Sequence, residues 1–114
     1  MKSILANLSF DFAVEVVKLC DNIKNRPVLK TQLIKSATSI GANIREANYA
    51  YSRAEFAAKL QIALKECNES QYWIELMSAT GGMPQEQATH LLNSCGTIRY
   101  KLIRSLNTVK GNDT

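Results

Sequence analysis

Residues 36–47 read SATSIGANIREA, and two opposing signals run through this short stretch. Ser36, Ser39 and Gly41 disfavour helix interiors, because hydroxyls compete for the backbone and glycine leaves the backbone too free. Apolar or small residues nevertheless recur at steps of three and four, the spacing of one helix face. They are Leu29, Leu33, Ala37, Ile40, Ile44, Ala47 and Tyr51. The stretch therefore predicts a long helix in which close packing must compensate for the polar and small residues.

A second helix is predicted directly after this one. Ser52 and Glu55 have the S-x-x-E spacing of a capping box, in which the serine and glutamate side chains bond the first free amides of a helix. Tyr51 and Phe56 stand at the flanking positions where two apolar side chains often pack together as a staple. We therefore expect one helix to end at about Tyr51 and the next to begin at once.

Helical spacing continues to both ends of the chain, and no stretch alternates with a period of two. Pro27, the pair Gly81 and Gly82, and Pro84 mark the remaining boundaries. We expect four helices, at about 4–24, 28–51, 53–80 and 84–110. Short connections place successive helices antiparallel. The predicted fold is all-α, an antiparallel up-and-down four-helix bundle formed by residues 1–114 as a single domain.

The composition fits an ordinary globular protein, with 46% hydrophobic and 21% charged residues. No run approaches the roughly 18 apolar residues of a membrane span, so we expect no membrane association and a cytoplasmic location. Cys20, Cys67 and Cys95 fall on apolar positions without paired spacing. We interpret them as buried thiols rather than as disulfides or metal ligands.

The second and third predicted helices carry a family resemblance. Residues 32–52, QLIKSATSIGANIREANYAYS, and 59–76, KLQIALKECNESQYWIEL, resemble the four-helix-bundle family of 23S rRNA intervening-sequence proteins. The signature of that family is a QL-x-x-S-x-x-SI-x-x-NI-x-E helix and an IA-x-x-E-x-x-E helix. The residues that match the first helix are Gln32, Leu33, Ser36, Ser39, Ile40, Asn43, Ile44 and Glu46.

The resemblance implies a symmetric homo-oligomer, a pentameric barrel of bundles. Related bundles, the accessory variability determinant proteins of diversity-generating retroelements, bind nucleic acid and a reverse transcriptase. By resemblance alone, a reverse transcriptase is therefore one candidate protein partner. The shorter family members, which this chain resembles more, imply no definite biochemical activity.

A polar stripe runs beside the apolar face of the second helix. Its members are Gln32, Ser36, Ser39, Asn43 and Glu46, and Glu66 and Glu69 of the third helix are expected to face it. One interpretation, which we favour, is close packing between two helices of the same chain. A second places the stripe at a subunit interface, where polar residues set the register. The third is a catalytic or metal site.

The residue types argue against the third interpretation. A di-iron bundle requires two Glu-x-x-His pairs, whereas His90 is the only histidine and Gln87 precedes it by three positions. A helical-bundle ribonuclease would require an arginine four to six residues before the histidine, and no glycine-rich phosphate loop is present. We therefore expect no catalytic residue, no metal and no cofactor, and a protein that is not an enzyme.

Charge is the stronger functional clue, since the formal net charge is +4. No acidic residue occurs between Gln87 and Asn112, and in an up-and-down bundle the end of the fourth helix lies beside the junction of helices two and three. The cations expected there are Arg45, Arg53, Lys59, Arg99, Lys101, Arg104 and Lys110. Clustered lysines and arginines attract nucleic-acid backbones without reading the base sequence.

Tyr49, Tyr51 and Tyr100 lie near the same end. They offer rings for base stacking, or they form a bundle rim with buried rings and exposed hydroxyls. Two functions remain open: an oligomeric accessory protein that contacts the RNA or DNA backbone, and an oligomeric scaffold whose partner is another protein.

Overall fold

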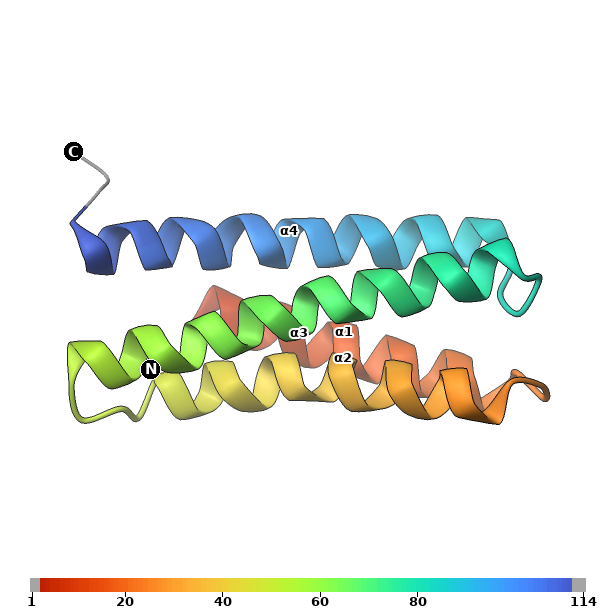
Figure 1. Ribbon diagram of the computed structural model, residues 1–114, viewed down its shortest axis with the longest axis horizontal. Helices are drawn as coiled ribbons and strands as arrows, with labels where there is room; N and C mark the ends of the chain where they lie inside the picture. The colour runs from red at the N-terminus through yellow and green to blue at the C-terminus, as the bar shows by residue number, and fades with distance from the viewer. Residues whose placement is uncertain (1–2, 112–114) are drawn as a thin grey trace.

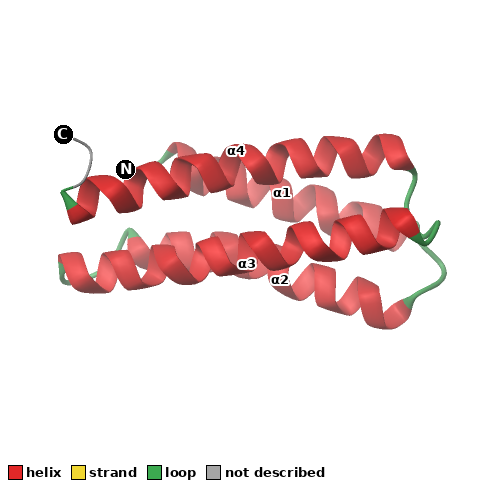
Figure 2. Cartoon of the chain, turned by 45° about the horizontal axis from the view of Figure 1, so that its top comes forward, coloured by secondary structure: helices red, strands yellow, loops and turns green. Residues whose placement is uncertain are grey.

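The computed structural model describes residues 3–111, and four helices account for most of them (Figure 1). These are α1 (Ile4–Asp21), α2 (Pro27–Ala47), α3 (Arg53–Ala79) and α4 (Gln85–Lys110). Each helix packs against its two neighbours around the bundle and not against the helix diagonally opposite. The α2–α3 interface is the most extensive and the α1–α4 interface is the least extensive. The four helices run side by side in both views (Figure 2). The predicted antiparallel four-helix bundle is confirmed.

The core forms where the apolar faces meet. Each helix contributes buried residues at steps of three and four, which is why the segments can bury one face while exposing the other. The largest fully buried side chains include Phe12 of α1, Leu33 and Ile40 of α2, Ile74 of α3 and Leu102 of α4. All three cysteines are buried, as the sequence predicted.

The α1–α2 connection begins earlier and ends earlier than predicted. α1 ends at Asp21 rather than residue 24, because the amide of Asn22 already bonds the carbonyls of the last turn. Proline at position 27 disfavours the right-handed helical conformation for the residue before it, and Arg26 takes the left-handed conformation with φ 61°. α2 then starts on Pro27, whose fixed φ suits a first helical position.

The α2–α3 turn differs most from the prediction, since α2 ends at Ala47 and not at Tyr51. The serine half of the predicted capping box is present, since the hydroxyl of Ser52 accepts the amide of Glu55 at 3.1 Å. The Glu55 carboxylate accepts the amide of Tyr51 at 2.9 Å, one residue before the amide that a capping box would use. Because the Tyr51 amide donates to Glu55, it does not continue the hydrogen-bond pattern of α2. The predicted staple is wrong, because the Tyr51 side chain is 99% exposed while Phe56 packs on the core.

At the other end of the bundle, α3 closes with a Schellman motif. The amide of Gly82 bonds the carbonyl of Met77 at 2.8 Å, and the amide of Gly81 bonds that of Ser78 at 3.2 Å. Gly81 adopts φ 77°, where a side chain is strained. Pro84 precedes α4 in an extended conformation as its capping residue, so α4 begins at residue 85 and not at residue 84.

Two glycine-to-alanine substitutions are expected to change stability in opposite directions. Gly81→Ala should lower the free energy of unfolding by about 1–2 kcal/mol, the cost of the left-handed conformation for a residue with a Cβ. Gly96→Ala should raise it by about 0.5–1 kcal/mol, because Gly96 lies inside α4 and a Cβ there meets only Arg99, at 3.9 Å. Urea unfolding followed by circular dichroism measures both. Shifts of the same sign would contradict this assignment of the α3 terminus.

The end of the bundle that carries the α2–α3 turn, residues 48–52, also carries the start of α1 and the end of α4, on the left in Figure 1. We call it the turn end. It is the end at which the sequence predicts the candidate nucleic-acid contacts.

Candidate nucleic-acid interface

Most of the predicted basic residues come from helix segments near the turn end. Arg45 lies in the last turn of α2 and Arg53 is the first residue of α3, with Lys59 less than two turns further on. Lys101, Arg104 and Lys110 lie in the last three turns of α4. Six of the seven predicted cations therefore lie in helix segments toward the turn end, but Arg45 belongs to α2 and Lys101, Arg104 and Lys110 belong to α4, and these two helices are not in contact.

Arg99 is the exception, because it lies near the middle of α4. Its guanidinium Nη1 donates to the Gln71 side-chain oxygen at 2.7 Å, across the α3–α4 interface. Arg99 is half-buried. It therefore links α3 and α4 near the middle of the bundle and does not add to the charge of the turn end.

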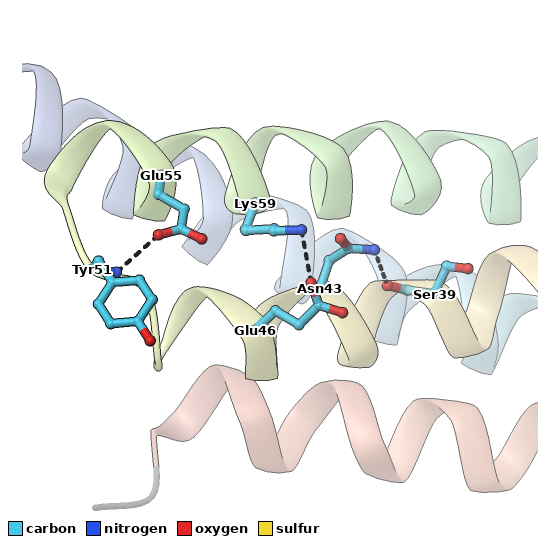
Figure 3. A network of polar contacts seen from close by, with 6 residues as sticks. All are labelled: Ser39, Asn43, Glu46, Tyr51, Glu55 and Lys59. Carbon is cyan, nitrogen blue, oxygen red and sulfur yellow. Dashed lines mark hydrogen bonds and ion pairs between the residues drawn. The ribbon is translucent and has the colours of Figure 1, made fainter.

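Three of the clustered cations are engaged within the protein. Lys59 Nζ lies 2.7 Å from the Glu46 carboxylate, and this hydrogen bond raises the pKa of Lys59 (Figure 3). Arg53 donates to the carbonyl of Val109 at 2.9 Å and so satisfies an end carbonyl of α4. Arg104 donates to the Tyr100 hydroxyl at 3.2 Å and lies 5.8 Å from the centre of that ring.

The other three, Arg45, Lys101 and Lys110, form no ion pair with any carboxylate among residues 3–111. Arg45 and Lys110 are exposed, and Lys101 is half-buried. The carboxylates of Glu46 and Glu55 near them are already bound, to Lys59 and to the Tyr51 amide. The turn end therefore presents positive charge that the described part of the chain does not neutralise.

The tyrosines of this end are exposed. Tyr49 and Tyr51, both in the α2–α3 turn, are 82% and 99% exposed, so the rim interpretation with buried rings is wrong for them. Figure 3 shows Tyr51 in the turn, with its backbone nitrogen facing the Glu55 carboxylate. Tyr100 is more than half exposed and lies under Arg104. Aromatic rings and free cations thus occur together at the turn end.

Ser36 of the polar stripe is buried between α2 and α3. Its hydroxyl accepts a hydrogen bond from Ser70 at 2.9 Å and donates to the carbonyl of Leu33 at 3.2 Å. Ser70 lies on the buried face of α3, and the sequence analysis did not identify it as the partner. The signal was present, since Ser70 is the one polar member of that face.

The rest of the stripe is less enclosed. Asn43 is half-buried and donates to the carbonyl of Ser39, one turn earlier, at 2.8 Å (Figure 3). Glu46 is exposed and pairs with Lys59 of α3. Gln32 is half-buried near the start of α2. These contacts lie within one chain, and they leave the outer side of the stripe open.

The two glutamates expected to face the stripe differ in environment. Glu66 is half-buried, and its partial burial, followed by the nearby charge of Glu69, raises the pKa of its carboxyl group. Glu69 is exposed. Neither takes part in an ion pair within residues 3–111. Beside them the indole nitrogen of Trp73 is buried without a hydrogen-bond acceptor.

The glycine within SATSIGANIREA, Gly41, lies where α2 packs closely against α1. A Cβ at this position would lie 3.3 Å from the hydroxyl of Ser9, which is itself fully buried on α1. Ser9 donates to the carbonyl of Ala6 at 3.2 Å, so no buried hydroxyl is left without a partner there. The small residues therefore allow α2 to approach α1 on one side, at Gly41, and α3 on the other, at Ser36.

Other reactive side chains are engaged or buried. His90 Nε2 lies 3.0 Å from the Glu15 carboxylate, between α4 and α1. The sulfurs of Cys67 and Cys95 lie 3.1 Å apart in the core, where their hydrogen bond and burial raise the pKa of the Cys95 thiol. Within residues 3–111, no three side chains of histidine, cysteine, aspartate or glutamate are grouped so as to hold a metal ion. None of the helices there is long and apolar enough to cross a membrane.

The comparison with known families settles the family. The model of the 23S rRNA-intervening sequence protein family matches residues 1–104. This chain belongs to that family. A solved structure of a protein with unknown function, from the S23 ribosomal protein family of Bacteroides thetaiotaomicron, is 42% identical in sequence. It superposes with a TM-score of 0.87 over 90% of this chain and 98% of that chain. No curated protein matches the chain.

Proposed function

We propose that this member of the 23S rRNA-intervening sequence protein family is an accessory protein without catalytic activity that contacts the RNA or DNA backbone through its turn end. The supporting observation is the free charge there: Arg45, Lys101 and Lys110 have no carboxylate partner among the described residues. Cations of this kind bind phosphates and release the counterions condensed around the nucleic acid. The exposed turn tyrosines add ring surface beside that charge.

The salt dependence of RNA binding tests this proposal. A labelled single-stranded RNA is titrated with the protein at about 50 and 200 mM salt, and binding is followed by fluorescence anisotropy. If about four phosphates are contacted, the affinity should fall on the order of 100-fold between the two conditions. No binding at the lower salt concentration, or an affinity that does not change with salt, would contradict the proposal.

A second candidate function, assembly into a homo-oligomeric scaffold, rests on the outer face of α3. A hollow of about 860 Å³ lies on that face, and every residue lining it belongs to α3. Ile62 and Tyr72 are exposed on it, and Trp73 is half-buried. Exposed apolar surface of this kind often marks a contact between proteins, and the resemblance to a pentameric family agrees with this candidate.

The native mass in solution tests assembly. For a chain of 12.7 kDa, light scattering should give a multiple of that mass. Replacing Ile62 by glutamate should shift the particle toward the monomer, because the interface would then have to bury an unpaired charge. A wild-type particle of 12.7 kDa at working concentration would remove this candidate while leaving the proposal on nucleic acid intact.

A further inference from the structure

A hollow of about 630 Å³ opens on the outer side of the α1–α2 pair at the turn end. Its size falls within the range usual for small-molecule sites, about 300–1,000 Å³. The side chains around it come from the first half of α1 and the end of α2, and they include Asn7, Phe10, Asp11, Arg45, Asn48 and Tyr49. This group combines two aromatic rings, one guanidinium, one carboxylate and two amides.

The two rings are not needed to build the core. Phe10 is 57% exposed, although Phe12, two positions later on α1, is buried. Tyr49 is exposed in the turn that follows α2. A scattered apolar side chain on a surface requires no explanation, but here two aromatic side chains line one hollow. Rings in such a position offer faces on which a flat base can stack.

The charges favour a base over a phosphate inside the hollow. The carboxylate of Asp11 lines it and would repel a phosphate. Arg45 lines it as well, and also lines a second hollow of about 430 Å³ that continues along α1 and α2. A strand whose base enters the hollow can therefore place its phosphates toward Arg45.

The amides suit the edge of a base. A side-chain amide carries both a donor and an acceptor, as base edges do. Asn48 uses one amide hydrogen toward the Ser3 hydroxyl at 3.4 Å, and its carbonyl oxygen accepts no hydrogen bond from the described residues. Asn7 is exposed beside it. The hollow thus has stacking surface, hydrogen-bonding groups and an adjacent cation.

We propose that this hollow receives an unpaired base of single-stranded nucleic acid, stacked against Phe10 and Tyr49 with its phosphate near Arg45. The inference rests on the function proposed above and sharpens it, because a bare basic surface binds single strands and duplexes through their phosphates alone. A stacking hollow requires a base that is free of its complement.

The test compares a short oligouridine strand with an RNA duplex of equal length, each labelled and titrated at low salt. Phe10→Ala and Tyr49→Ala should each weaken oligouridine binding about 5- to 100-fold, the usual loss for one stacked base. Each should change duplex binding by no more than about twofold, since phosphate contacts remain. Val28→Ala is the control, because Val28 is an exposed apolar residue at the opposite end of α2.

The remaining outcomes separate this inference from the proposed function. If both aromatic variants bind oligouridine like the wild type, while affinity still falls with salt, the hollow is not a base site and the basic end remains the binding surface. If the wild-type protein binds neither oligouridine nor the duplex, both proposals are overturned. If Phe10→Ala lowers the native mass, Phe10 contacts a second copy of the chain, and the base site is overturned.

Discussion

Replacing Phe12 by alanine is expected to lower the free energy of unfolding by about 3–5 kcal/mol, the largest stability effect we predict for a single substitution. Phe12 is 1% exposed and is among the largest fully buried side chains of the bundle. Removing its ring forfeits the burial of apolar surface and leaves a cavity that rigid helices cannot close completely. Since a domain of this size has only about 5–15 kcal/mol of stability, the urea midpoint should fall sharply.

The matched control is Phe10→Ala, on the same helix and with the same atoms removed. Because the Phe10 ring is more than half exposed, its loss should change the free energy of unfolding by no more than about 0.5 kcal/mol. Both variants are unfolded with urea at the same protein concentration and followed by circular dichroism. Equal losses would mean that the Phe10 ring is packed as well, and a small loss for Phe12→Ala would contradict its place in the core.

The sequence predicted the helices well because one physical signal dominates them. Apolar residues at helical spacing specify which side of each segment is buried, and Leu33, Ile40 and Ile44 all lie in the core as expected. The capping box at Ser52 and the glycine at position 81 located the ends of α2 and α3 to within a few residues, because each leaves a recognisable local hydrogen-bond pattern.

Contacts between helices were less predictable, because spacing shows that a residue faces inward but not which helix it meets. Ser70 was not predicted as a contact, yet it is the buried hydrogen-bond partner of Ser36. The contact between the Cys67 and Cys95 sulfurs was likewise not anticipated. Both depend on how far neighbouring helices are rotated and shifted, which is a property of the packed bundle and not of one segment.

The candidate interface was likewise predicted only in part. The cluster at the turn end followed from the topology alone, and six of the seven cations predicted there come from helix segments near it. Arg99 was misplaced, because it lies near the middle of α4, where its side chain bonds Gln71 of α3. The hollow at Phe10 was not predicted. Helical spacing places Phe10 off the face that buries Phe12, but it does not show that Tyr49 and Arg45 line the same hollow.

Neutralising the free cations of the turn end should have the largest effect on nucleic-acid binding. In a variant that combines Arg45→Gln, Lys101→Gln and Lys110→Gln, we expect affinity for single-stranded RNA at about 50 mM salt to fall about 10- to 100-fold. The slope of log affinity against log salt should become shallower by about 2–3, since each lost phosphate contact removes about 0.7–0.9. These three residues are chosen because none has a carboxylate partner among residues 3–111, so the fold should tolerate their loss.

The control is a variant with the same change in net charge on another part of the surface. Lys18→Gln, Lys24→Gln and Lys35→Gln remove three exposed cations, at the end of α1, in the α1–α2 connection and in the first half of α2. Both variants lower the formal charge of +4 by three. If only the net charge of the protein matters, the two triple variants should lose affinity equally, and the turn end would have no special role. If binding is local, the control should keep nearly the wild-type affinity and salt slope, because screening limits each charge to about 10 Å at ordinary salt.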